Sequence, residues 1–206
     1  MLWRGRPYPV NLVSGLGRRG RIVAIVTRNP GLTLSALWIL VGLATIVAYW
    51  SQPPLARLRT SPTALELIKE REGLMLTAYR DPRGRLTIGY GHASDVTPGM
   101  TVSQREAERL FHGDIARIER EVKRHVRAPM TENEFSAMVA LAYNIGADAF
   151  RRSTILAAFN DGDRTQAADA FLLWNKIRHE DGDLVPSVHL TKYRDSERRL
   201  FLGEGD

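Results

Sequence analysis

Hydrophobic and polar residues form three successive patterns along this chain. Residues 31–50 are uncharged and mostly apolar, two short β-like runs follow at 74–79 and 86–90, and helical periodicity dominates from residue 103 onward. Helical spacing indicates amphipathic helices, short runs bounded by turn residues indicate strands, and about 20 apolar residues match the thickness of a bilayer. The sequence therefore predicts an α+β fold that is mostly α, preceded by one transmembrane helix.

Capping signals place the start of two long helices in the second half of the chain. Ser103 with Glu106, and Thr131 with Glu134, match the capping box, in which each side chain bonds the backbone N–H of the other residue. The first of these helices is expected to run to about Val126. The second capped helix is predicted at 135–145. Further helices are predicted at 62–72, 164–174 and 188–202. A loop of low periodicity precedes the last helix.

Three polar side chains meet where the helix predicted at 62–72 passes into the β-like runs. Glu72 ends the helical pattern, Asp81 begins a Pro- and Gly-containing turn, and Thr87 lies on the returning run. If the hairpin folds back over the helix end, the two carboxyl groups face each other across a gap wide enough for a sugar and a water. Glycoside hydrolysis needs such a pair, with one carboxyl protonating the leaving oxygen and one ionised carboxylate activating water. The hydroxyl of Thr87 is placed to hold the same water.

Short motifs follow these three residues in order as far as residue 202. They are TIGYGH at 87–92, AYNIG at 142–146, FRRST at 150–154, WNK at 174–176 and a final helix ending in RRLFL. With the Glu-x8-Asp-x5-Thr spacing, the set resembles the phage-type lysozymes or endolysins of glycoside hydrolase family 24. The resemblance implies a two-lobed lysozyme-like fold, in which a small β-hairpin lobe and a helical lobe enclose a cleft.

The same resemblance implies an N-acetylmuramidase that acts on the glycan strands of peptidoglycan. The bond cleaved would be the β-1,4 bond between N-acetylmuramic acid and N-acetylglucosamine. Glu72 would be the general acid, and Asp81 and Thr87 would hold the attacking water, which gives inversion if the carboxyls lie about 6.5–9.5 Å apart.

Other residues are candidates for contact with the substrate. Asn144, at the end of the apolar helix, is one, although its side chain could equally cap local backbone. Tyr90 is a second candidate. Ser153 and Thr154 either line the cleft or cap a helix, and the pattern alone does not decide between these roles.

Two residues are expected to support the site without touching substrate. His92 closes the TIGYGH motif and is expected to make a structural hydrogen bond behind the hairpin. Arg194 is the candidate to pair with Glu72 or to brace its loop. The family commonly has Gly-Leu and then a double arginine in this region, whereas this chain has Tyr193-Arg194 and lacks the glycine.

Charge is distributed unevenly and limits the choice of partner. The net charge is +6, but eight arginines and no acidic residue precede Glu66, which leaves 21 basic and 23 acidic residues in 66–206. A near-neutral folded part gives no support for nucleic-acid binding. The five histidines occur without a zinc motif and cysteine is absent, so neither a metal nor a cofactor is expected. The protein is predicted to be a monomer.

The N-terminal part divides into three segments before a catalytic domain at 62–206. Residues 1–30 are predicted as a basic cytoplasmic arm, 31–50 as a transmembrane helix or signal anchor in inner-membrane lipid, and 51–61 as an extended linker. Arginines before the span place the N-terminus in the cytoplasm and the catalytic domain in the periplasm or outside the cell. The anchor resembles that of signal-anchor-release endolysins. Permanent anchoring is an equally good interpretation.

Two other function classes share part of this pattern. A lytic transglycosylase cleaves the same polymer with a single Glu and leaves an anhydro sugar, which the presence of Asp81 and Thr87 disfavours. A catalytically weak wall-binding or scaffold protein with the same fold is the alternative from another class of function. Measuring turnover and product mass separates the three.

Overall fold

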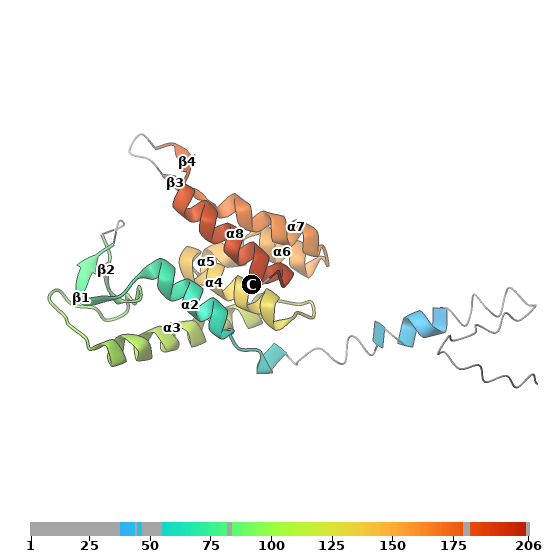
Figure 1. The fold of residues 1–206 in the computed structure, drawn as a ribbon, viewed down its shortest axis with the longest axis horizontal. Coiled ribbons are helices and arrows are strands. Elements are labelled where there is room, and N and C mark those ends of the chain that lie inside the picture. The colour runs from blue at the N-terminus through green and yellow to red at the C-terminus, as the bar shows by residue number, and fades with distance from the viewer. Residues whose placement is uncertain (1–37, 44, 47–54, 82–83, 179–181, 205–206) are drawn as a thin grey trace, which may run out of the picture. The chain divides into compact units, whose positions relative to one another are not determined.

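The computed structural model describes residues 38–43, 45–46, 55–81, 84–178 and 182–204. The chain divides into two units, Met1–Ile46 and Val47–Asp206 (Figure 1). In the first unit the described residues are helical. Across the described parts of both units, no helix has the length and apolar character needed to cross a membrane. The predicted arm 1–30 and most of the predicted span 31–50 lie outside the described residues and stay predictions.

The second unit is mostly helical, with two small antiparallel hairpins. Figure 1 shows one hairpin at one end of this unit, the helices from α4 onward at the other, and α3 extending between them. In chain order the elements are η1 (Leu55–Arg57), α2 (Pro62–Glu72), β1 (Met75–Arg80), β2 (Leu86–Gly89), α3 (Gln104–His125), α4 (Glu132–Ile145), α5 (Ala147–Arg151), α6 (Thr154–Asn160), α7 (Arg164–Ala170), η2 (Phe171–Trp174), β3 (Lys176–Arg178), β4 (Leu184–Pro186) and α8 (Val188–Leu202). The predicted α+β, mostly α class is therefore confirmed for this unit.

Both predicted capping boxes are present. The Ser103 hydroxyl accepts the Glu106 N–H at 3.3 Å, and the Glu106 carboxylate accepts the Ser103 N–H at 2.8 Å. Thr131 and Glu134 make the same reciprocal pair at the start of α4. α4 ends at Gly146, whose φ of 87° is a conformation that glycine adopts without steric cost. Local sequence thus fixes where the two central helices begin.

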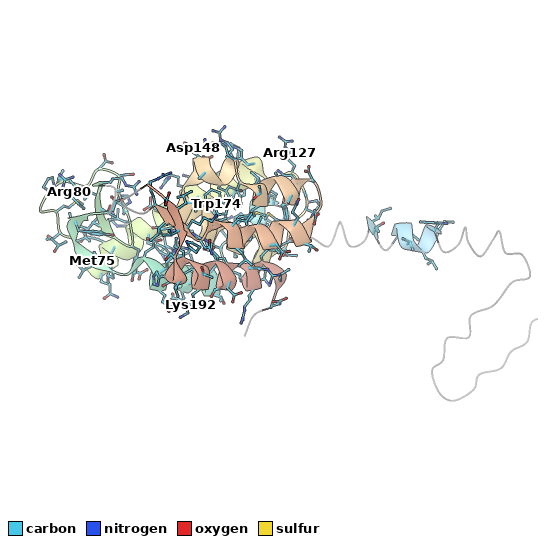
Figure 2. The ribbon with its side chains drawn as sticks, turned by 90° about the horizontal axis from the view of Figure 1, so that it is seen from above. Met75, Arg80, Arg127, Asp148, Trp174 and Lys192 are labelled. Carbon is cyan, nitrogen blue, oxygen red and sulfur yellow. The ribbon has the colours of Figure 1, made fainter. Side chains whose placement is uncertain are left out.

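α4 is the centre of the helical core. Phe135, Met138 and Leu141 are completely buried on it, and α2, α3 and α8 pack around it. Figure 2 shows the side chains of this unit, with Met75 and Arg80 at the hairpin end and Asp148 and Arg127 at the helical end. The core therefore forms a rigid base beneath the hairpin lobe.

Leu141→Ala is expected to lower the free energy of unfolding by about 2–5 kcal/mol, because it leaves a cavity in a close-packed core. Urea titration followed by circular dichroism measures the change. Leu173→Ala is the matched control, since Leu173 is 65% exposed and its truncation should change stability by less than about 0.5 kcal/mol. Equal losses in the two variants would contradict this description of the core.

The last residues of the predicted extended linker 51–61 are packed against the domain instead. Leu58 is buried, and its carbonyl accepts a hydrogen bond from the Lys123 ammonium at 2.6 Å. The N–H and hydroxyl of Thr60 both donate to the Glu119 carboxylate, at 2.8 and 2.9 Å. Burying an apolar side chain and satisfying the buried Glu119 both stabilise this docking.

The predicted loop before the last helix contains a second hairpin. β3 pairs antiparallel with β4, from Lys176 opposite Pro186 to Arg178 opposite Leu184. Strands of three residues are too short to show a periodic pattern, which explains why the sequence did not predict them. The helix predicted at 164–174 is also divided, because α7 changes to the 3₁₀ helix η2 at Phe171.

Candidate active site

The first hairpin holds Asp81 in a fixed orientation at its turn. The Asp81 carboxylate accepts the Arg85 backbone N–H at 2.9 Å and pairs with the Arg85 guanidinium at 3.2 Å. The backbone closes the same turn, because the Asp81 N–H donates to the Arg85 carbonyl at 2.9 Å. Charge-assisted hydrogen bonds to a carboxylate stabilise its ionised form. The turn therefore orients the Asp81 carboxylate through backbone and side-chain bonds.

Glu72 is the last residue of α2, and its side chain is partly covered. The Glu72 side chain is 23% exposed, and its carboxyl accepts a hydrogen bond from the Nε of Arg71 at 3.0 Å. Gly91 lies against its other oxygen, since a Cβ on Gly91 would stand 3.4 Å from Glu72 Oε2. Glu72 is thus held on one side by a guanidinium and bordered on the other by bare backbone.

Tyr79, on β1, feels the charges of both Glu72 and Asp81. Burial raises the pKa of the Tyr79 phenol, and the negative charges of Glu72 and Asp81 raise it further. A single side chain on β1 is therefore within electrostatic reach of both carboxyl groups. The facing of the two carboxyl groups across one glycosidic bond stays a prediction.

Thr87 lies on β2 directly opposite Tyr79 in the hairpin register. Its side chain is buried, and its hydroxyl donates to the Arg85 carbonyl at 3.1 Å. With its proton committed in this way, the hydroxyl oxygen keeps lone pairs that can accept a hydrogen bond. Thr87 is fixed as an acceptor close to the Asp81 turn.

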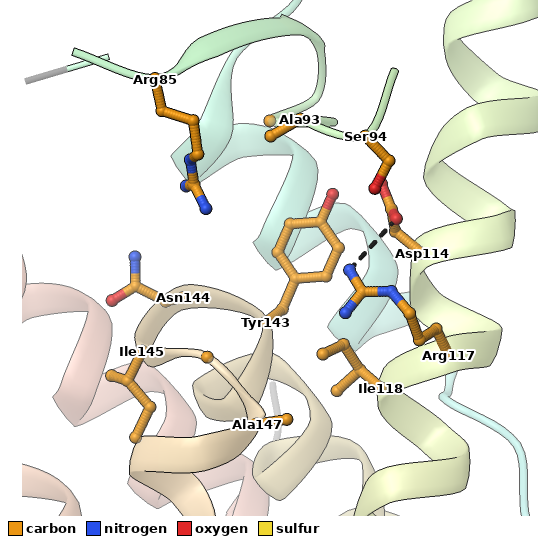
Figure 3. Close-up of a pocket in the computed structure, with 12 residues that line it drawn as sticks. Arg85, Ala93, Ser94, Asp114, Arg117, Ile118, Tyr143, Asn144, Ile145 and Ala147 are labelled. Atoms are coloured by element: carbon orange, nitrogen blue, oxygen red, sulfur yellow. Dashed lines mark hydrogen bonds and ion pairs between the residues drawn. The ribbon is translucent and has the colours of Figure 1, made fainter. Parts of the chain in front are cut away.

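A cavity of about 390 Å³ lies between the first hairpin, α3 and the end of α4 (Figure 3), and its lining includes Arg85 but not Glu72, Asp81 or Thr87. Arg85 extends into it from the hairpin, Arg117 from α3, and Tyr143 and Asn144 from the end of α4. Gly91 lines the same cavity and lies next to Glu72, whereas Glu72 itself is not among the lining residues. The cavity is therefore a cleft with walls from both lobes.

Asn144 and Arg194 belong to a buried polar network behind the cleft. The Arg194 guanidinium donates to the side-chain oxygen of Asn144, to the Glu197 carboxylate at 2.7 Å and to the Trp174 carbonyl at 2.9 Å. The predicted pairing of Arg194 with Glu72 differs from this arrangement, because Arg71 makes the ion pair with Glu72. Arg71 is adjacent to Glu72 on α2, whereas Arg194 is committed to three other partners.

Tyr90 and His92 both support the hairpin from behind. The Tyr90 ring is buried against Phe111, with ring centroids 5.3 Å apart, and its hydroxyl donates to Glu108 at 3.0 Å. His92 Nδ1 lies 2.8 Å from the Asp114 carboxylate, consistent with the structural hydrogen bond expected for it. The burial of Tyr90 favours a packing role over contact with substrate.

Ser153 and Thr154 lie at the start of α6. The Ser153 hydroxyl accepts the Leu156 N–H at 3.2 Å, and Ser153 itself is buried. Thr154 is exposed as the first residue of the helix. Neither residue is among those that line the described cavity. The capping interpretation, which the sequence left open, accounts for Ser153.

The sequence did not single out several residues around the cleft. Tyr143 donates its hydroxyl to the Tyr90 carbonyl at 2.7 Å, and Asp114 bonds both His92 and Arg117. Tyr143 and Tyr90, and Asp114 and His92, are far apart in sequence, so no local pattern reveals these two contacts, although Tyr143 is part of the AYNIG motif. Within the described ranges, no three His, Cys, Asp or Glu side chains are grouped closely enough to hold a metal ion.

Gly91→Ala is expected to lower kcat by roughly tenfold or more, because its φ of 90° is unfavourable for alanine and its Cβ would press on the Glu72 carboxyl. Gly99→Ala is the matched control, since Gly99 also has a positive φ of 79° but nothing lies within 4 Å of its added Cβ. Kinetic assays of both variants at equal folded fraction measure the difference. Equal kcat values would contradict the contact with Glu72.

Comparison with known proteins agrees with this architecture. The solved muramidase domain of SpmX from Asticaccaulis excentricus superposes with a TM-score of 0.66 at 37% identity, covering 71% of this chain and 99% of that domain. The small hairpin lobe, the helical lobe and the cleft between them therefore define a lysozyme-like fold. The Phage lysozyme family model matches residues 69–197. The chain belongs to the phage lysozyme family.

Two relatives extend the comparison. The Endolysin of Acyrthosiphon pisum secondary endosymbiont phage 1 is 38% identical over 141 residues, which cover 68% of this chain and 96% of that protein. The SAR-endolysin of Bacteriophage PS119 is 34% identical over 104 residues, covering 50% of this chain and 62% of that protein. The similarity to the first relative spans nearly its whole length.

Proposed function

We propose that this protein is a peptidoglycan hydrolase, an N-acetylmuramidase that cleaves the β-1,4 bond between N-acetylmuramic acid and N-acetylglucosamine. The observation that carries the proposal is the arrangement of Glu72 and Asp81. One terminates α2 beside the cleft, the other is held in the hairpin turn, and both charges act on Tyr79. Membership of the phage lysozyme family and the similarity to an endolysin support the same substrate class.

The proposed mechanism is a single displacement at the anomeric carbon. Glu72 gives its proton to the glycosidic oxygen as that bond breaks, and water attacks the opposite face of the sugar ring. Asp81, kept ionised by Arg85, takes the proton from this water, and the Thr87 oxygen accepts the second hydrogen of the same water. The two carboxyls exchange protonation states, and the product anomer is inverted.

The other predicted residues have supporting roles in this proposal. Asn144 lines the cleft beside Tyr143 and is the candidate for contact with N-acetyl groups of the glycan. Arg194 fixes the orientation of Asn144. His92 and Tyr90 hold the hairpin against α3, as their bonds to Asp114 and Glu108 indicate. Ser153 and Thr154 define the start of α6.

We further propose that residues 31–50 anchor the enzyme in the inner membrane, with residues 1–30 in the cytoplasm and the catalytic unit outside it. The uncharged sequence of this segment supports the proposal, and so does the similarity to a protein named SAR-endolysin. Because residues 55–60 are docked on the domain, the free tether is shorter than the predicted linker 51–61. The enzyme would then act as a monomer on the nearest wall layers.

Digestion of purified sacculi by the full chain in non-ionic detergent tests the enzymatic proposal. Mass analysis of the released fragments is expected to show muropeptides with reducing N-acetylmuramic acid ends. Anhydro ends, lighter by one water, would identify a lytic transglycosylase instead. Binding to sacculi without any release of fragments would identify a wall-binding protein and overturn the proposal.

A further inference from the structure

We propose that Arg71 is the positioning residue for Glu72, and that a buried network through Glu197 and Arg194 holds it and connects the general acid to Asn144 in the cleft. The inference rests on the proposed function, because it assigns Glu72 the role of proton donor. It adds Arg71 and Glu197, which the sequence motifs did not single out, to the predicted residues Asn144 and Arg194. The three elements involved, α2, α4 and α8, pack against one another in the helical lobe (Figure 1).

All three nitrogens of the Arg71 guanidinium are bound. Nε donates to Glu72 at 3.0 Å, Nη1 to Glu197 at 2.8 Å and Nη2 to the Ala140 carbonyl at 3.2 Å. The side chain is only 4% exposed. A guanidinium is a rigid planar fork, so three partners in its plane leave it no freedom to rotate. The Glu72 carboxyl is therefore bonded to a buried guanidinium that three partners orient.

Glu197 and Arg194 complete the network on α8. Both are fully or almost fully buried, at 0% and 1% exposed, and they are paired at 2.7 Å. Burial raises the pKa of the Glu197 carboxyl, and the two guanidiniums beside it oppose that rise. Arg194 then donates to Asn144. An unbroken series of charge-assisted bonds thus runs from Glu72 to the side chain that faces the cleft.

The charges explain why this arrangement suits a proton donor. A guanidinium beside an unshared carboxyl would favour its ionised form, which cannot donate a proton. Here Arg71 also pairs with the Glu197 carboxylate, which is fully buried from solvent. The positive charge of Arg71 is therefore divided between two carboxyl groups. Arg71 therefore orients the Glu72 carboxyl while its positive charge is also paired with Glu197. Removing Arg71 and removing the charge of Glu197 should then shift the pH profile in opposite directions.

The two tyrosines near Glu72 do not titrate in the pH range of this test. Burial raises the pKa values of Tyr79 on β1 and Tyr143 on α4, so both phenols stay neutral across the working pH range. Asp81 is held by Arg85 in all the variants considered.

The experiment measures kcat, KM and the pH dependence of kcat for full-length Arg71→Met, Arg71→Lys and Glu197→Gln in detergent. Arg71→Met is expected to lower kcat by roughly 10- to 100-fold with KM changed less than about threefold, and to move the alkaline limb to higher pH. Arg71→Lys keeps the charge but loses the fork, so kcat should fall while the limb stays in place. Glu197→Gln should move the limb to lower pH.

A rescue variant keeps the proposal falsifiable if Arg71→Met folds poorly. The Tyr193 ring lies 5.9 Å from the Arg71 guanidinium, on the helix that carries Arg194. Tyr193→Arg combined with Arg71→Met places a guanidinium in the same space. The double variant is expected to have a kcat at least tenfold higher than that of Arg71→Met alone. Thermal unfolding of each variant separates loss of fold from loss of orientation.

Lys69→Met is the matched control, because Lys69 lies on the same helix and pairs with Glu108 at 2.9 Å, away from Glu72. It should change stability but leave kcat and the pH profile as in the parent protein. Folded Arg71 variants with parental kcat and pH profile would overturn the inference while leaving the proposed function intact. An inert parent protein would instead overturn the proposed function.

Discussion

Glu72→Gln is expected to reduce the hydrolysis of peptidoglycan by roughly 10³-fold, because the amide cannot donate a proton to the leaving oxygen. The fold should persist, since glutamine has the same shape and can still accept the hydrogen bond from Arg71. Release of reducing ends from sacculi measures the rate, and the thermal unfolding midpoint checks the fold.

Glu70→Gln is the matched control for this substitution. Glu70 lies on the same helix, two residues earlier, and is exposed. The same chemical change there should leave activity within about twofold. If Glu72→Gln also kept most of the activity, Glu72 would not be the general acid and the mechanism would have to be abandoned.

Asp81→Asn is expected to lower kcat by roughly 10²- to 10⁴-fold, because the neutral amide can neither take a proton from water nor stabilise positive charge on the sugar. It also removes the ion pair with Arg85, which is 61% exposed, so the associated loss of stability should be small. Kinetic measurement on muropeptide-bearing glycan strands, with KM determined separately, measures the effect.

Asp148→Asn controls for the loss of an exposed aspartate–arginine pair. Asp148 pairs with Arg151 at 3.5 Å on α5, and both side chains are exposed. This variant should keep parental kcat and stability. Near-parental turnover by Asp81→Asn as well would show that Asp81 is a structural residue of the turn.

The elements predicted most accurately are those specified by neighbouring residues. Ser103 with Glu106 and Thr131 with Glu134 begin α3 and α4 where the capping boxes placed them, and Gly146 ends α4. Such bonds join residues three positions apart, so the sequence displays them directly. The spacing of Glu72, Asp81 and Thr87 is equally local, because one helix end and one hairpin determine it.

Features that depend on distant contacts were not predicted. Arg71 bonds to Glu197, 126 positions later, and Thr60 bonds to Glu119, 59 positions later. No local pattern reports such pairs, because only the packing of α2 and α3 against the other helices brings them together. Arg194 was expected to pair with Glu72 or to brace its loop, but Arg71 makes the pair with Glu72. The last residues of the expected linker are docked on the domain through similarly distant contacts.

The anomer formed at the new reducing end is the most direct test of the central claim, that a water lies between two carboxyls on opposite faces of one glycosidic bond. Proton NMR during the first minutes of digestion of a soluble glycan strand distinguishes the two anomers before they equilibrate. The account predicts that the α-anomer appears first, inverted from the β-linked substrate. Initial release of the β-anomer, or no cleavage of the strand, would contradict it.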